Sequence, residues 1–310
     1  MKTYRLSPDL SLIDIAPEMP GFDSFLGIYL LETGKIALID VGPTAGVGNL
    51  LSGLKEVGVN PANVSYILLT HIHMDHAGGV GKILEEMPDA KVVVHERGAP
   101  HMVDPARLWE DSQRALGQMA RDYGPITPVP EDRIIIAKDG MLVDLDGVEL
   151  EVIETPGHAP HHLSFWDNKE GRLFAGEAAG VYNDVVGYVR PSAPPPFHIE
   201  HAINSLDKLI SLNPKTLYYA HFGGVDQALS QLNSYKPRLV MWVKTVVDCL
   251  ENGDGEPEIY AAIRENDDSV ALIGKLPADQ CDRETYFVDN TIAGFTAYIE
   301  RFGSEYISQL

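Results

Sequence analysis

The sequence predicts a layered fold that mixes helices and strands. Short apolar runs of strand length alternate with segments in which apolar residues recur at helical spacing. One of these runs, residues 67–69, leads directly into a histidine-rich cluster at residues 71–76. With 310 residues, 45% of them hydrophobic, the chain can bury the core of one large α/β domain, with or without an appendage.

The first part of the chain establishes this alternation. Residues 46–57 are predicted to be helical, because five apolar side chains share one face and Gly58 suits the helix end. A hairpin is expected around Thr33 and Gly34, and a second helix is expected to continue from the histidine cluster to about residue 86. The strands expected here lie at residues 3–6, 10–15, 25–31, 35–40, 67–69 and 91–95.

Two helical segments depart from the alternation. Residues 96–131 are predicted to be an inserted helical segment within a domain that spans residues 1–224, and residues 225–310 a C-terminal helical extension packed on that domain. Residues 181–198 are expected to form an irregular loop. The remaining expected elements are strands at 134–137, 148–155, 162–166, 172–175 and 216–220, helices at 200–212, 225–252 and 285–302, and one or two short helices within 257–276.

The charge balance excludes several classes of partner. The chain has 24 basic and 45 acidic residues, a net charge of −21, so its field repels nucleic acids and anionic membranes. No run of about 18 apolar residues predicts a transmembrane helix, and the first residues lack the apolar core of a signal peptide. Two cysteines, Cys249 and Cys281, are too few for a disulfide framework. We therefore expect a cytoplasmic protein with a small-molecule substrate, and a homo-oligomer is left open.

The histidine cluster predicts a metal site. His71 and His73 are two residues apart in an extended segment, so their side chains point the same way and can hold one ion. Asp75 and His76 follow as the chain turns into a helix, where they can face a second ion. Imidazole and carboxylate donors suit zinc, with iron and manganese as alternatives.

Three further candidate ligands each follow an apparent strand. They are His158 after Thr155-Pro-Gly, Glu177 after Gly176, and His221 after Ala220. Together with the cluster His71-x-His73-x-Asp75-His76, these motifs resemble, in order, those of the metallo-β-lactamase-fold hydrolases. That superfamily includes glyoxalase II-like thioesterases, lactonases and phosphodiesterases. The resemblance covers about residues 1–224, and its first motif is the most specific.

The resemblance implies an αββα sandwich with two metal ions at one edge. His71, His73 and His158 would hold the first ion, and Asp75, His76 and His221 the second. Asp40 matches a position that orients the ligands from behind. Glu177 stands where the family normally has aspartate. Its longer side chain leaves three arrangements open: bridging both ions, binding one ion only, or leaving the second site weak.

The predicted activity is hydrolysis of a small carboxylic ester, lactone or thioester by a metal-bridged hydroxide, with Asp75 taking a proton from the attacking water. The alternatives are a phosphodiesterase of the same fold, a mononuclear-iron redox enzyme resembling the dioxygenases, and a catalytically silent metal-binding regulator. Candidate substrate contacts are Tyr182, Tyr188, Arg190 and His198.

Overall fold

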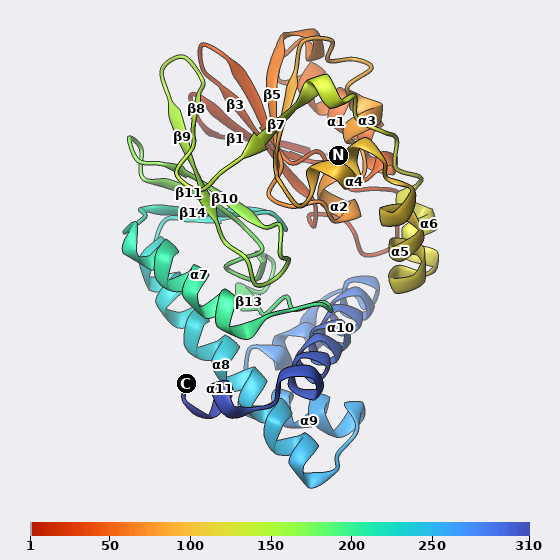
Figure 1. Ribbon diagram of the computed structural model, residues 1–310, viewed down its shortest axis with the longest axis vertical. Coiled ribbons are helices and arrows are strands. Elements are labelled where there is room, and N and C mark those ends of the chain that lie inside the picture. The colour runs from red at the N-terminus through yellow and green to blue at the C-terminus, as the bar shows by residue number, and fades with distance from the viewer. Residues whose placement is uncertain (1) are drawn as a thin grey trace. The chain divides into compact units, whose positions relative to one another are not determined.

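The computed structural model describes residues 2–310 and divides into two compact units (Figure 1). The first unit comprises the chain through Glu154 together with His161–Phe174, and the second comprises Thr155–Pro160 together with Ala175–Leu310. The predicted boundary between a domain at 1–224 and an extension at 225–310 stays a prediction. Among the described residues, none of the helices combines the length and the apolar character that a membrane span requires.

A seven-stranded sheet in strand order β1 to β7 forms the first layer of the first unit. Its first four strands pair antiparallel, and its last four pair parallel with helical crossovers between them. In β6, three consecutive valines are buried, as expected for a strand covered on both faces. The strands are β1 (Lys2–Ser7), β2 (Leu10–Asp14), β3 (Gly27–Glu32), β4 (Ile36–Ile39), β5 (Val64–Leu68), β6 (Lys91–His95) and β7 (Ile134–Ala137).

A second, antiparallel layer in the same unit runs from β8 (Leu142–Asp144) through β9 (Glu149–Glu154) and β10 (Leu163–Asp167) to β11 (Arg172–Gly176). The two layers pack face to face. The buried rings of Tyr29 and Phe174 lie 5.3 Å apart in an edge arrangement, worth about 0.5–1.5 kcal/mol beyond the area they bury. Arg172 bridges the layers at one end, where its guanidinium pairs with Asp9 and Asp167.

Helices cover the outside of the seven-stranded sheet (Figure 1). In α1, Leu50 and Leu54 are fully buried, and Gly53 lets the helix lie directly on Ile13 of β2, which a methyl group at that glycine would meet at 2.3 Å. The helices of this unit are η1 (Thr44–Gly46), α1 (Val47–Glu56), η2 (Pro61–Asn63), α2 (Met74–Ala77), α3 (Val80–Ile83), α4 (Ala99–Val103), α5 (Ala106–Leu116), α6 (Gln118–Tyr123) and η3 (Glu131–Arg133).

The second unit is mainly helical. Its long helices α8 and α10 pack on each other and on α9. Trp242 of α8 and Phe295 of α10 are both fully buried. The indole N–H of Trp242 donates to Asp267 at 2.8 Å, so the one polar atom of that ring is satisfied. The elements are β12 (Val181–Asn183), β13 (Tyr188–Arg190), α7 (Ile199–Ser211), β14 (Thr216–Tyr219), β15 (Gly224–Val225), α8 (Ala228–Asn252), α9 (Glu256–Asn266), η4 (Val270–Lys275), α10 (Ala278–Phe302) and α11 (Glu305–Ser308).

Two local predictions were wrong, and one strand was not predicted. The helix expected to run to residue 86 is two short helices, α2 and α3, separated by two glycines at the turn. The segment 181–198, expected to be irregular, contains the β12–β13 hairpin, closed around Gly187 at a φ of +68°. The short strand β8 was missed, because three residues give too little alternation to predict a strand.

Candidate metal centre

The loop after β5 carries the first group of candidate metal ligands. Residues 69–73 connect β5 to α2. His71 and His73 lie on the extended part of this loop, and their ring centroids are 4.5 Å apart. His76 in α2 brings its ring to 4.1 Å from that of His71. One turn of the chain therefore gathers three imidazoles, as the two-residue spacing and the following helix predict. We call His71, His73, Asp75 and His76 the N-terminal half-site.

Asp75 adds a carboxylate to this group. It lies in the first turn of α2, and its Oδ2 is 3.4 Å from Nε2 of His76. The side chain of Asp75 keeps 16% of its surface exposed, whereas that of His76 keeps 2%. Asp75 is thus the ligand candidate of this pair that solvent can reach.

Asp40 organises the loop from the end of β4. Its carboxylate accepts hydrogen bonds from the backbone N–H and the hydroxyl of Thr70, both at 2.8 Å, and contacts Nδ1 of His76 at 3.0 Å. Its φ of +59° lies in the left-handed region, which costs a non-glycine residue about 1–3 kcal/mol. Because Nδ1 of His76 is held by Asp40, Nε2 is the nitrogen that can bind a metal. Thr70 orients His71 in the same way, because its hydroxyl lies 3.0 Å from Nδ1 of that histidine.

Two histidines that were not predicted to belong to the site lie beside it. The ring of His161 stacks on that of His71 at 6.3 Å and meets that of His73 at 5.7 Å. The buried ring of His162 is 5.2 Å from that of His71. Their only signal in the sequence is that they follow His158 closely, and this does not predict a contact with a loop some 90 residues earlier.

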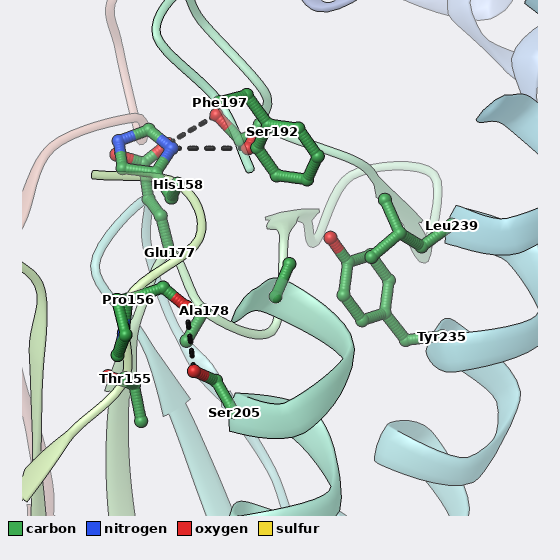
Figure 2. Close-up of a pocket in the computed structure, with 11 residues that line it drawn as sticks. Thr155, Pro156, His158, Glu177, Ala178, Ser192, Phe197, Ser205, Tyr235 and Leu239 are labelled. Atoms are coloured by element: carbon green, nitrogen blue, oxygen red, sulfur yellow. Dashed lines mark hydrogen bonds and ion pairs between the residues drawn. The ribbon is translucent and has the colours of Figure 1, made fainter. Parts of the chain in front are cut away.

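The second unit contains another ligand group, formed by His158, Glu177 and His221. We call these three residues the C-terminal half-site. Nε2 of His158 lies 3.0 Å from Oε2 of Glu177, and Nε2 of His221 lies 3.4 Å from Oε1. Ser192 completes the group, because its hydroxyl donates to Oε1 of Glu177 at 2.7 Å (Figure 2). All three half-site residues are at most 5% exposed.

The electrostatics of this group keep Glu177 ionised. Burial opposes the charged form, but the imidazoles of His158 and His221 outweigh it and hold the pKa of Glu177 well below its ordinary value. A buried carboxylate between two imidazoles is an arrangement that suits a divalent cation, because its negative charge is otherwise costly to bury. Glutamate has a longer side chain than aspartate, and the two carboxylate oxygens of Glu177 each lie beside a different histidine.

Backbone turns position two of these ligands, His158 and Glu177. Gly157 precedes His158, and a methyl group there would lie 2.6 Å from the Cα of Ala202, so only glycine lets the loop lie against α7. The hydroxyl of Ser205 in α7 donates to the carbonyl of Pro156 at 2.7 Å and fixes the same loop (Figure 2). Gly176, at a φ of +58°, turns the chain at the end of β11 just before Glu177.

A small cavity lies beside the C-terminal half-site. Its volume is about 10 Å³, enough for at most one water molecule, so it is no substrate pocket. Figure 2 shows Tyr235 and Leu239 of α8 on one side of it and His158 with Glu177 on the other.

The four predicted substrate contacts have different surroundings. Arg190 is 1% exposed and donates to Glu284 at 2.7 Å, and Tyr188, 2% exposed, donates to the same carboxylate at 2.8 Å. Burial, followed by the charge of Glu284, raises the pKa of Tyr188 well above its ordinary value. The positions of Tyr188 and Arg190 therefore give the prediction of substrate contact no support.

Tyr182 and His198 are less enclosed. The ring of Tyr182 stacks on that of Tyr219 at 5.3 Å, and burial raises its pKa. The ring of His198 stacks on that of His201 at 3.9 Å, just before α7, and burial lowers the pKa of His198. Both are half-buried, so a contact with substrate stays a prediction for these two residues.

The donor atoms fit divalent metal ions. Five of the seven candidate ligands are imidazoles and two are carboxylates, and they belong to groups of His, Asp and Glu that could hold a metal. His71, His76 and His158 each have Nδ1 held by a protein oxygen, which leaves Nε2 as the ligand atom, as in metal sites generally.

The fold and these ligand groups define a class of protein. The sequence profile of the Metallo-beta-lactamase superfamily matches residues 28–221, more than half of the chain. The chain belongs to the metallo-β-lactamase superfamily, and the predicted fold class is confirmed.

Individual relatives cover most of the chain. Metallo-beta-lactamase fold-containing protein ST1585 of Sulfurisphaera tokodaii is 31% identical over 215 residues, which are 68% of this chain and 77% of that protein. Its crystal structure superposes with a TM-score of 0.64 at 28% identity, covering 75% of this chain and 87% of that one. TTHA1429 of Thermus thermophilus, a metallo-beta-lactamase family protein, shares the fold over 96% of this chain and 95% of its own, with a TM-score of 0.68 and 24% identity.

One relative carries an enzyme name and extends into the C-terminal helices. The atrochrysone carboxyl ACP thioesterase of Aspergillus fumigatus is 25% identical over 295 residues, 90% of this chain and 81% of that protein.

Proposed function

We propose that this protein is a dinuclear metal-dependent hydrolase that acts on a small carboxylic ester, lactone or thioester. The observation that carries the proposal is the matched pair of half-sites. Each consists of buried or half-buried imidazoles and a carboxylate. A protein oxygen on Nδ1 orients His71 and His76 in the N-terminal half-site and His158 in the C-terminal half-site. Membership of the metallo-β-lactamase superfamily supports the hydrolase class.

The proposed ligand sets follow the motif order. His71, His73 and His158 would hold one ion, and Asp75, His76 and His221 the other. Glu177 would bridge the two, which its contacts with both His158 and His221 support. When bound, divalent ions such as zinc would activate water at neutral pH and polarise the carbonyl oxygen of the substrate. Manganese and iron suit the same donors.

The chain's own residues then account for the proton. In hydrolysis, water adds to the carbonyl carbon, the bond to the alkoxide or thiolate leaving group breaks, and one proton passes from the attacking water to that leaving group. Asp75 is the candidate general base, because it is the partly exposed carboxylate of the N-terminal half-site. Asp40 cannot serve in this way, since its oxygens are already engaged by Thr70 and His76.

Two observations favour an acyl substrate over a phosphodiester. The net charge of −21 repels polyanions. The relative that matches 90% of the chain is named as a thioesterase, so a thioester has the strongest support among the acyl substrates. A mononuclear-iron redox enzyme and a silent metal-binding regulator remain the alternatives that the test must separate.

The test is removal and return of metal. The protein is stripped with a chelator and reloaded separately with zinc, manganese and iron(II), and its metal content is measured per chain. Each form is assayed on aryl esters, lactones, acyl thioesters and bis(p-nitrophenyl) phosphate. We expect two ions per chain and acyl hydrolysis that disappears on stripping and returns with metal.

Three results would contradict the proposal. Full hydrolysis by metal-free protein would exclude a metal-dependent reaction. One iron per chain with oxygen consumption would favour the redox enzyme. Silence on every substrate, with two ions bound, would favour the regulator. Metal at a hundred times its dissociation constant should also stabilise the fold by about 2.7 kcal/mol, seen as a higher melting temperature.

A further inference from the structure

Ser192 connects two candidate metal ligands to each other. Its carbonyl oxygen lies 3.1 Å from Nδ1 of His158, and its hydroxyl donates to Oε1 of Glu177 at 2.7 Å (Figure 2). The carbonyl and the hydroxyl of Ser192 thus each contact a different ligand of the C-terminal half-site.

These contacts hold His158 and Glu177 in an orientation in which they can bind a metal. A carbonyl oxygen can only accept, so Nδ1 of His158 must carry a proton, and Nε2 is the nitrogen left to bind a metal. The terminal torsion of a glutamate is broad, and a hydroxyl donor on one oxygen narrows it. Ser192 therefore sets the tautomer of His158 and restrains the carboxylate of Glu177 at the same time.

The segment that carries Ser192 is itself held by α10. We call residues 190–194 the ligand strap. The hydroxyl of Thr291 donates to the carbonyl of Pro191 at 3.2 Å. Gly294 packs against Ala193 so closely that a methyl group at the glycine would lie 1.6 Å from the Ala193 carbonyl oxygen.

The charged end of the strap is anchored to the same helix. Arg190 donates to Glu284 at 2.7 Å, and its guanidinium also lies over the ring of Phe287 at 5.1 Å. Both charges are 1% exposed, so removing Glu284 would leave the guanidinium of Arg190 buried without its carboxylate. Glu284, Thr291 and Gly294 are spaced by seven and three residues, which puts all three on one face of α10.

We propose that Ser192 is a positioning residue for His158 and Glu177, and that α10 sets their metal affinity by holding the ligand strap. This rests on the proposed metal-dependent function. On this proposal the C-terminal helix α10 supports the metal ligands, a role that neither its sequence nor its distance along the chain indicates. Replacing a group that orients ligands in this way typically lowers metal affinity about 10–100-fold.

The first experiment changes only the hydroxyl of Ser192. The dissociation constant for zinc is measured by competition with a chromogenic chelator, and the cobalt(II)-loaded protein is examined by visible absorption. We expect Ser192→Ala to weaken metal binding about 10–100-fold and to change the cobalt spectrum. Ser192→Thr keeps the hydroxyl and should stay within about threefold of wild type, with the wild-type spectrum.

The second experiment changes a glycine of α10, and a different glycine of the same unit serves as the control. Gly294→Ala must displace the strap at Ala193, so metal binding should weaken about tenfold or more. Gly274→Ala, in η4 of the same unit, meets nothing within 4 Å and should leave binding unchanged. Circular dichroism and thermal unfolding of the metal-free proteins show that each variant folds. If Gly294→Ala does not fold, Thr291→Val removes one strap contact at nearly constant shape.

The outcomes separate the inference from the function on which it rests. Wild-type protein that binds metal, together with folded Ser192→Ala and Gly294→Ala variants of equal affinity and spectrum, would overturn the positioning role and leave the hydrolase standing. Equal loss in Ser192→Ala and Ser192→Thr would assign the effect to packing and would also overturn it. Wild-type protein that binds no metal would overturn both.

Discussion

The two half-sites are built in opposite ways. The N-terminal half-site takes four candidate ligands from residues 71–76, all in one loop and the helix that follows it. The C-terminal half-site takes His158, Glu177 and His221 from three separate segments. The first needs one correct turn of the backbone. The second needs three segments to arrive at the same place.

The surrounding structure differs accordingly. One residue, Asp40, supports the N-terminal half-site by holding Thr70 and His76, and it does so from the end of the strand paired with β5. The C-terminal half-site is supported by α7 through Ser205 and by α10 through the ligand strap. Ligands that are close in sequence are kept together by local backbone geometry. Ligands that are far apart need buttressing by later parts of the chain, which gives such parts influence over the site.

The largest effect is expected from removing a ligand of the N-terminal half-site. His71→Ala should lose bound metal and lower hydrolysis by more than about 100-fold, because even groups that only orient ligands cost about 10–100-fold. Metal content per chain and the rate on the best ester or thioester measure this. His101→Ala, a half-exposed histidine in α4, is the matched control.

A wild-type rate and metal content in His71→Ala would show that the histidine cluster is not the metal site. The N-terminal half-site would then have no role in metal binding.

A smaller effect, on stability, is expected where α10 anchors the ligand strap. Burial opposes the ionisation of Glu284, but Arg190 and Arg283 outweigh it and lower its pKa from 4.5 to about 2. Because the folded pKa is the lower one, ionised Glu284 stabilises the fold fully above pH 4.5 and loses this contribution as the pH falls toward 2. The difference corresponds to about 3 kcal/mol.

Glu284→Gln should therefore lower the free energy of unfolding by about 3 kcal/mol at neutral pH, with the gap to wild type closing below pH 4.5. Urea unfolding between pH 7 and pH 3 measures this. Glu300→Gln, exposed on the same helix, should unfold like wild type. A gap that is constant with pH would assign the loss to packing instead of charge.

The smallest effect of the three is expected at Asp40. Asp40→Asn keeps the shape but replaces one acceptor oxygen with an amide and removes the charge beside His76. Metal affinity should fall about 10–100-fold, as for other groups that orient ligands. The affinity is measured as for Ser192→Ala. An affinity equal to that of wild type would show that Asp40 does not orient a metal ligand.

The sequence predicted the parts of the site that depend on local pattern. The strand leading to His71, the spacing of His71 and His73, and the turn into α2 are local features, and the structure has all three. Helix α1 and the helical pair α8 and α10 follow from apolar periodicity, and their predicted ranges overlap the observed ones. The β12–β13 hairpin was missed because its turn, closed at Gly187, joins strands of only three residues each.

Contacts between distant segments could not be predicted in the same way. Arg190 was a candidate substrate contact because an arginine in a loop can bind an anion, yet its partner is Glu284, in a helix near the end of the chain. Ser192 carries no signal in the sequence, since a serine in a proline-rich stretch suits many loops. Its importance comes from what its carbonyl and hydroxyl reach.

The amino-acid sequence by itself determined the family, the alternation of strands and helices, and the identity of the candidate ligands, because each depends on residue type and on spacing within a few residues. Only the tertiary structure decided which oxygen orients each imidazole, how Glu177 meets two histidines, and that α10 holds the ligand strap. Those contacts join residues far apart in the chain. Packing and the cost of burying an unpaired charge determine which residues form these contacts. Neither can be read from a local sequence pattern.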